Sequence, residues 1–132
     1  IIGGDTWETP EFLQIGGEAV EGIVFSTFFA KDKPINAESE KFLKAFDENY
    51  KGTEPSAVSA LGYDAYRVIL DAIKRANSTD PQKVRDQLEK TKNFMGAAGN
   101  ITFDQDRNAV KNAVIKQVQG GQFKYLTTIE PK

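Results

Sequence analysis

The sequence predicts an α/β fold, because stretches typical of strands alternate with amphipathic helical stretches along its 132 residues. Residues 22–29 (GIVFSTFF) are a near-continuous β-branched and aromatic run, the pattern of a strand buried on both faces. Residues 56–76 carry apolar side chains at helical spacing, and residues 113–129 alternate around a Gly-Gly pair as a β-hairpin does. The chain has too few strands to close a sheet alone.

The opening of the chain is its most informative stretch. Residues 1–2 (Ile-Ile) are interpreted as the end of a buried strand, which the Gly-Gly pair at residues 3–4 then breaks with a turn. Asp5 and Trp7 follow at the carboxyl end of that strand, the edge at which open α/β sheets bind ligands. There is no initiator Met, and nothing precedes residues 1–2 that could pair with them. We therefore expect a longer parent protein.

Two helices are expected in the first half of the chain. Thr9 can cap a helix that has Pro10 at its first position and that ends at the glycines of residues 16–17. After a charged connector, Asn36 can cap a second helix that runs to about Tyr50.

The second half is predicted to contain two more helices before the hairpin. The helix at residues 56–76 should bury a wide apolar stripe, which consists of Val58, Leu61, Ala65, Val68, Ile69, Ala72 and Ile73. Residues 80–81 (Asp-Pro) begin the next helix, with the acid as cap. A short strand around residues 101–103 and a polar turn at residues 104–108 follow.

The composition excludes several classes of function. The net charge is −2, with 17 basic and 19 acidic residues interspersed, whereas nucleic-acid binding needs a concentrated cationic face. Cys and His are absent, which excludes thiol chemistry, Cys/His zinc sites and His-based triads. Residues 104–108 begin like a calcium loop, but Ala109 and Ile115 replace its required Gly and Glu. We expect a binding or structural role without a metal or other cofactor.

Three segments of the chain carry a family resemblance. They are residues 1–7 with 18–29 (IIGGDTW, EAVEGIVFSTFF), residues 54–73 (EPSAVSALGYDAYRVILDAI) and residues 94–126 (FMGAAGNITFDQDRNAVKNAVIKQVQGGQFKYL). In this order and spacing they resemble the carboxyl-terminal third of type I periplasmic binding proteins. The match is to the branched-chain amino-acid (Leu/Ile/Val) class, the solute receptors of ABC importers. Each motif is loose by itself, but the ordered set is specific.

The resemblance implies a fragment of a two-lobed fold. The family has two doubly wound α/β lobes with parallel sheets, which three crossover strands join around a trapped ligand. Residues 1–27 would belong to the second lobe, and residues 28–107, largely helical, to the first lobe after the hinge crossover. Residues 108–132 would return to the second lobe as the C-terminal β-hairpin. The chain would therefore hold two of the three crossings and lack most of both sheets.

The resemblance also implies ligand-binding residues at the start of the chain. Asp5 stands where the family places an acidic residue that pairs with the ligand's α-ammonium group, and such a hydrogen bond contributes about 1.5–3 kcal/mol. The alternative is that Asp5 is an ordinary turn residue. Thr6 could donate from its backbone or hydroxyl group. Trp7 either forms the floor of the ligand pocket or packs against the following helix.

A second group of implied site residues opens the long helix. Ser56, Ala57 and Val58 occupy the position from which the family lines the cleft on the first lobe. They are small here, whereas branched-chain members can carry an aromatic residue nearby, so the size of the ligand stays open. A helix amino terminus also attracts anions, while capping is the plainer account of Ser56.

The leading hypothesis is a non-enzymatic solute-binding protein that captures an amino acid or a related amino-carboxylate for ABC-transporter import. It would be periplasmic or extracellular, with lipid anchoring through the missing N-terminus as one option. Its partners would be the amino acid, an ABC permease in the membrane and the missing N-terminal portion, and exposed sheet edges would favour a dimer. The alternative is the ligand-sensing domain of a receptor or regulator. An α/β enzyme is disfavoured, because His, Cys and a nucleophile elbow are absent.

Overall fold

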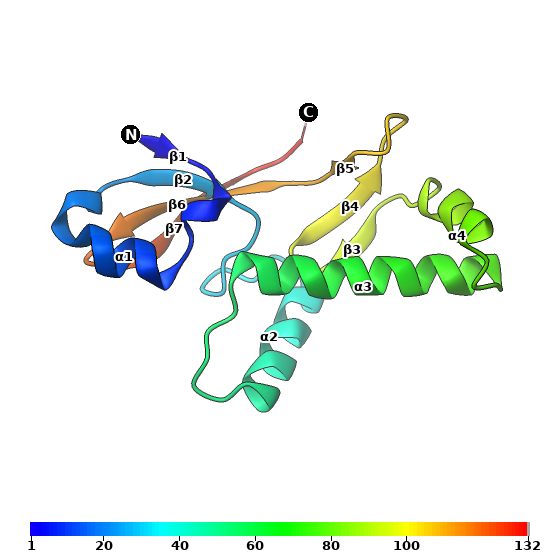
Figure 1. Cartoon of the computed structure of the whole chain (residues 1–132), viewed down its shortest axis with the longest axis horizontal. Helices are drawn as coiled ribbons and strands as arrows, with labels where there is room; N and C mark the ends of the chain where they lie inside the picture. Colours follow the sequence, from blue (N-terminus) through cyan, green and yellow to red (C-terminus); the bar gives the residue numbers. More distant parts are fainter. Residues whose placement is uncertain (132) are drawn as a thin grey trace.

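Both ends of the chain build one four-stranded sheet, in a computed structural model that describes residues 1–131. The strands lie in the order β1 (Ile2–Gly3), β2 (Val24–Thr27), β6 (Ala113–Gln119) and β7 (Gln122–Ile129) (Figure 1). The expected α/β class is confirmed. Among the described residues only β1 and β2 form a parallel pair, because β6 returns antiparallel to β2 and a hairpin joins it to β7.

The predicted hairpin is confirmed, and its glycines explain its turn. Gly120 and Gly121 have positive φ angles of 59° and 69°, which a two-residue turn matched to the strand twist requires at both positions. Their N–H groups donate to the carboxylate of Glu21, at 2.9 and 3.4 Å. The segment just before β2 thus holds the far end of the hairpin.

The predicted burial of the first two strands is partly wrong. β2 has a strand on each side, as expected of a central strand, but Phe25 and Thr27 are buried while Ser26 is exposed. The side chains therefore alternate between a covered face and an open face. Ile1 and Ile2 are 91% and 84% exposed, because β1 is the edge of the sheet within the described residues and has a strand on one side only.

Aromatic side chains fill the covered face of the sheet beneath α1 (Pro10–Gly16). Thr9 caps this helix as predicted, since its hydroxyl accepts from the N–H of Phe12 at 3.2 Å. Phe12 stacks on Phe123 of β7, with ring centroids 6.5 Å apart. Phe123 in turn meets Phe25 edge-on at 5.2 Å. This contact chain fixes α1 on the sheet.

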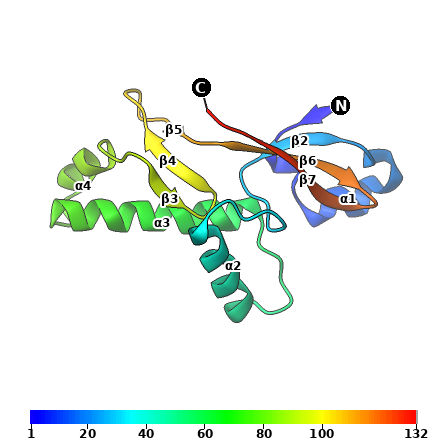
Figure 2. The same ribbon diagram turned by 180° about the vertical axis from the view of Figure 1, so that it is seen from behind.

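The middle of the chain forms a second body of helices around a small sheet (Figures 1 and 2). Its elements are α2 (Ala37–Asn49), α3 (Ala57–Ala76), α4 (Pro81–Leu88), β3 (Phe94–Gly96), β4 (Gly99–Phe103) and β5 (Ala109–Val110). The predicted caps are confirmed: Asn36, Ser56 and Asp80 each accept from backbone N–H groups of the turn they begin. The core consists of Phe29, Phe42, Ala57, Ala60, Ala97 and Ala98.

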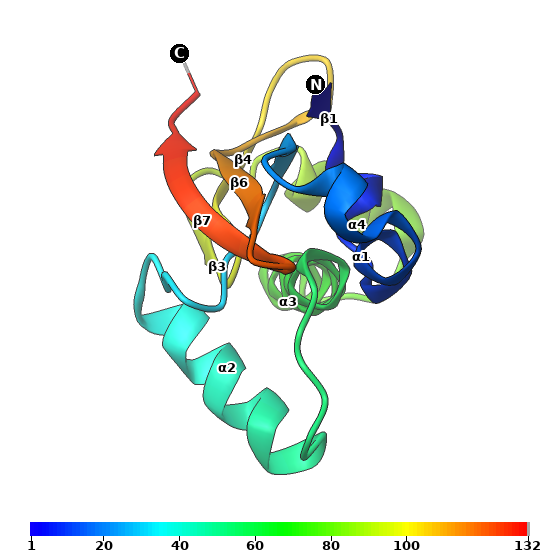
Figure 3. The ribbon, with the colours of Figure 1, turned by 90° about the vertical axis from the view of Figure 1, so that its left-hand side faces the viewer.

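The predicted apolar stripe of α3 is only half covered. Val68 and Ala72 are buried, but Val58 is 75% exposed, and Ala65 and Ile69 are exposed as well. The reason is that α2, α4 and the small sheet cover only part of the circumference of α3 (Figures 1 and 3). Between residues 1 and 131, no helix has both the length and the apolar composition needed to cross a membrane.

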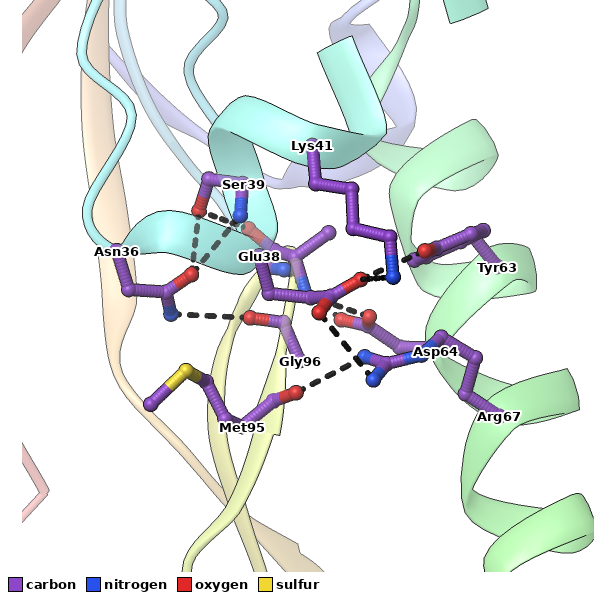
Figure 4. A network of polar contacts seen from close by, with 11 residues as sticks. Asn36, Glu38, Ser39, Lys41, Tyr63, Asp64, Arg67, Met95 and Gly96 are labelled. Atoms are coloured by element: carbon purple, nitrogen blue, oxygen red, sulfur yellow. Dashed lines mark hydrogen bonds and ion pairs between the residues drawn. The ribbon is translucent and has the colours of Figure 1, made fainter. Parts of the chain in front are cut away.

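A polar network joins α2, α3 and β3 (Figure 4). The Arg67 guanidinium lies 3.3 Å from the Glu38 carboxylate and donates to the carbonyl of Met95 at 3.0 Å. The Tyr63 hydroxyl donates to the other oxygen of Glu38 at 2.7 Å. Burial, together with this bond to an anion, raises the pKa of Tyr63 to about 12.

Asp64 fixes the turn between β3 and β4. Its fully buried carboxylate accepts from the N–H groups of Ala97 at 2.6 Å and Ala98 at 2.8 Å. Burial raises the pKa of Asp64, and the two backbone hydrogen bonds oppose that rise. Because both N–H groups are buried away from water, the turn depends on an ionised or strongly polarised acceptor at this position.

We expect Asp64→Asn to lower the free energy of unfolding by about 2 kcal/mol, because one backbone N–H would then face an amide NH₂ in a buried site. Asp104 provides a matched control, since its carboxylate also accepts from two backbone N–H groups, those of Asp106 and Asn108, but in an exposed turn. Asp104→Asn should cost much less. Urea denaturation followed by circular dichroism measures both changes, and equal losses would contradict this account.

Candidate functional site

A cleft of about 490 Å³ lies between the two bodies, and both supply its walls. Glu8, Lys116 and Phe123 line it from the sheet body. Lys31, Glu54 and Ser56 line it from the segments that lead into the helical body. Charged groups of both signs therefore surround a partly apolar space, the mixed lining that is typical of a small-molecule site.

The deepest polar group of the cleft is a buried ion pair. The ammonium of Lys116 contacts the Glu8 carboxylate, and the two side chains are only 6% and 10% exposed. The other carboxylate oxygen of Glu8 accepts from the hydroxyl of Thr27, which is fully buried. Each charge is costly to bury but is matched by the other, so removal of either partner would leave an uncompensated ion.

A second ion pair crosses the rim of the cleft. Lys31, in the connector after β2, contacts Glu54, in the segment before α3, and the two side chains are 46% and 72% exposed. Water screens such a pair, which typically contributes less than about 1 kcal/mol. The rim pair therefore contributes little to stability.

The predicted residues at the start of the chain lie in η1 (Asp5–Trp7), beside the cleft and outside its lining. Asp5 and Thr6 are exposed, and the Asp5 carboxylate has no hydrogen-bond or ion-pair partner among residues 1–131. Trp7 is half-buried and stacks on Phe12, with ring centroids 5.3 Å apart. A Cβ atom at Gly3 would lie 2.1 Å from the indole, so the close packing of Trp7 needs glycine there.

The three predicted residues at the start of α3 point in different directions. Ser56 lines the cleft and caps the helix, with its hydroxyl accepting from the N–H of Ser59 at 3.3 Å. Ala57 is buried in the core of the helical body. Val58 faces solvent. The structure thus brings Ser56 to the cleft and turns Ala57 and Val58 away from it, while Asp5 and Thr6 shortly precede the lining residue Glu8 in the sequence.

Sequence reasoning missed Glu8 and Lys116. A signal for Lys116 exists, because it stands between Val114 and Val118 at the inward positions of an alternating strand. A lysine at such a position needs a buried anion as partner. Nothing in the local sequence identifies that anion, since Glu8 is 108 residues away.

The two connections between the bodies contact each other. Phe28 follows β2 directly, and the ammonium of Lys111, just before β6, lies 5.2 Å from the centroid of its ring. Among the described residues this buried ammonium has no hydrogen-bond acceptor. Burial lowers the pKa of Lys111 to about 8, against the opposing attraction of Asp64.

Comparison with known proteins gives one consistent family. A family model described as periplasmic binding protein matches residues 2–122. The leucine binding protein of Thermotoga maritima superimposes with a TM-score of 0.91 and 44% identity, over 99% of this chain and 37% of that one. The branched-chain amino acid transporter substrate binding protein of Streptococcus pneumoniae, solved with isoleucine, superimposes with a TM-score of 0.87 and 32% identity. That match covers 99% of this chain and 37% of the other.

A curated relative agrees with the structural matches. The Leu/Ile/Val-binding protein homolog 1 of Brucella abortus is 33% identical over 104 residues, which are 79% of this chain and 27% of that protein. The chain thus spans about a quarter of the length of the curated relatives it matches, and little more than a third of the solved ones.

We expect Lys111 to make stability rise with pH between about 8 and 10.5. In that window the folded protein has released the Lys111 proton while the unfolded chain, with an ordinary lysine pKa of 10.5, still holds it. Tyr63 acts in the opposite direction only above pH 10, because its pKa is raised on folding. Urea denaturation between pH 7.5 and 9.5 therefore isolates Lys111.

The matched variants are Lys111→Met and Lys83→Met, the second at an exposed lysine of α4. The unsubstituted protein should gain stability relative to Lys111→Met as the pH rises through this range. Its difference from Lys83→Met should stay constant. A difference from Lys111→Met that does not change with pH would contradict the buried charge.

Proposed function

The chain belongs to the periplasmic binding protein family, and on that premise we propose that it forms part of a non-enzymatic solute-binding protein that captures an amino acid for import. The observation that carries this proposal is the close match, over 99% of the chain, to proteins whose names state leucine or branched-chain amino acid binding. The cleft between the two bodies supports it, because a partly apolar pocket with a few polar groups is typical of a small-molecule site.

The topology supports a division of the chain between two lobes. Residues 1–27 and 108–132 would belong to one lobe, and residues 28–107 to the other; Lys132 lies outside the described residues. In support, β1, β2, β6 and β7 share one sheet, while α2, α3, α4 and the small sheet form the other body. The contact between Phe28 and Lys111 then lies at the hinge.

Closure of these lobes would bury the ligand at the cleft. Asp5 would pair with the α-ammonium group, because its exposed carboxylate has no other partner among residues 1–131. Thr6 and Trp7 would adjoin the ligand on the same lobe, and Ser56, followed by Ala57 and Val58, would face it from the helical body. The groups for the ligand carboxylate would come from the remainder of the parent protein.

The uncovered apolar surfaces support the existence of that remainder as a partner. Val58, Tyr66 and Ile69 on α3, and Ile1 and Ile2 at the sheet edge, are exposed, although large apolar groups in contiguous patches are usually covered. The remainder of both lobes would cover them, and the alternative is that a dimer through the same sheet edge covers them.

We propose that the parent protein lies in the periplasm or outside the cell, is lipid-anchored and docks on an ABC permease.

We expect leucine, isoleucine or valine to raise the melting temperature of the full-length protein in a screen of the twenty amino acids. In that protein, Asp5→Asn should weaken binding at least tenfold, or about 1.4 kcal/mol, because the ammonium group loses its anion. Asp106→Asn is the matched control, since Asp106 is an exposed aspartate like Asp5 but lies in the turn after β4, away from the cleft. Calorimetry that finds unchanged affinity for Asp5→Asn would remove Asp5 from the site.

We expect the 132-residue chain by itself not to bind free amino acids at micromolar concentration. The ligand carboxylate would stay unpaired in an incomplete cleft. The free-energy cost of leaving it unpaired would exceed the favourable binding free energy that Asp5 and Trp7 contribute. Calorimetric titration of leucine into the chain, with the full-length protein as the positive control, measures this. Saturable micromolar binding would show that the rest of the protein is dispensable for capture.

A further inference from the structure

We propose that Glu8 is a positioning residue of the ligand site, which holds the turn that carries Asp5 by contacting Lys116 and Thr27 across the sheet. This inference rests on the proposed function, because it assigns to Glu8 an effect on ligand binding that passes through Asp5. Glu8 itself is satisfied by its two protein partners.

The turn that carries Asp5 has little regular structure of its own. β1 pairs with β2 at only two positions, Ile2 with Val24 and Gly3 with Phe25. η1 adds two backbone hydrogen bonds, from Trp7 N–H to the Gly4 carbonyl at 3.2 Å and from Glu8 N–H to the Asp5 carbonyl at 3.1 Å. Side chains at the end of the turn must therefore fix its place.

Two adjacent side chains anchor the end of the turn. Trp7 covers Gly3 and stacks on Phe12, which attaches the turn to α1. Glu8 contacts Thr27 of β2 and Lys116 of β6, which attaches it to the two central strands. The Trp7 contact is apolar and non-directional, whereas the carboxylate of Glu8 has directional contacts at both oxygens. Of these two anchors, Glu8 therefore sets the position more sharply.

The nature of the pair supports positioning over simple stabilisation. Lys116 lies between Val114 and Val118 on the covered face of β6, where a packed apolar side chain is usually at least as stabilising as a buried ion pair. An ion pair instead specifies where its partner must lie. Here the partner belongs to the turn, with Asp5 three residues before Glu8 and bonded to it through the backbone.

A thermodynamic cycle in the full-length protein tests this proposal. Affinity for leucine is measured by calorimetry for the unsubstituted protein, Asp5→Asn, Glu8→Gln and the double variant. Glu8→Gln should weaken binding at least fivefold when Asp5 is present and less than twofold when Asp5 is already replaced. The matched control is Asp86→Asn at the exposed Arg85–Asp86 pair of α4, which lies outside the lining of the cleft and should change affinity less than twofold.

The possible outcomes separate the two proposals. If leucine does not bind the unsubstituted protein, or Asp5→Asn leaves its affinity unchanged, the failure lies in the proposed site. If Asp5→Asn weakens binding and Glu8→Gln does not, the positioning role is overturned. If Glu8→Gln has the same effect in both backgrounds, Glu8 contacts the ligand independently, which also overturns it.

A second variant keeps the test valid if Glu8→Gln fails to fold because Lys116 is left unpaired. Glu8→Gln combined with Lys116→Gln removes both charges and retains polar side chains at both positions. This variant should regain the ligand-free melting temperature while leucine affinity stays at least fivefold weaker, a separation that a merely structural role would not produce. Recovery of both quantities together would overturn the proposal.

Discussion

The antiparallel pairing of β2 with β6 is the interaction on which the rest of the structure depends. It aligns Val24 with Gln117 and Thr27 with Val114, so it joins the start of the chain to its end. The same register brings the two connections between the bodies together, since one begins after Thr27 and the other ends before Ala113. It also sets Lys116 opposite Phe25, within reach of Glu8. The cleft, the hinge and the anchored turn all follow from this register.

Position determines what a charged side chain does in this molecule. Lys116 with Glu8 and Lys31 with Glu54 are the same pair of residue types around the same cleft. The first is buried and specifies geometry, and the second is exposed and screened by water. Asp64 and Asp104 show the same contrast for backbone capping, one inside the helical body and the other on an exposed turn. Burial, more than the chemical identity of the partners, decides how much each contact matters.

Local patterns predicted the elements well because the causes of those elements are local. The caps at Thr9, Asn36, Ser56 and Asp80 need only one side chain and the turn that follows it. The hairpin turn needs only two glycines with positive φ. Burial was predicted poorly at Ile2, Ser26 and Val58, because it depends on which element lies opposite, and the local pattern does not identify that element.

The candidate site shows the same division. Ser56 was proposed from the family resemblance, with helix capping as the alternative, and in the structure it both caps α3 and lines the cleft. Glu8 was missed because its importance arises from Lys116 and Thr27, to which only the folded sheet brings it. The ligand roles of Asp5, Thr6, Trp7, Ser56, Ala57 and Val58 all stay predictions, and of these residues only Ser56 lines the cleft.

The separation of β2 from β6 along the chain also has a consequence for the order of folding. Closing a loop costs entropy that grows with its length, and β2 cannot pair with β6 until Ala113 and the residues after it are available. Contacts within the helical body close shorter loops, such as the one between Asp64 and Ala97, whose sequence separation is 33 residues. This body should therefore form first and bring the two connections together. Until then the strand around Phe25 has no partner on the β6 side. During synthesis this apolar segment is exposed to misassociation for as long as the ribosome takes to reach the hairpin.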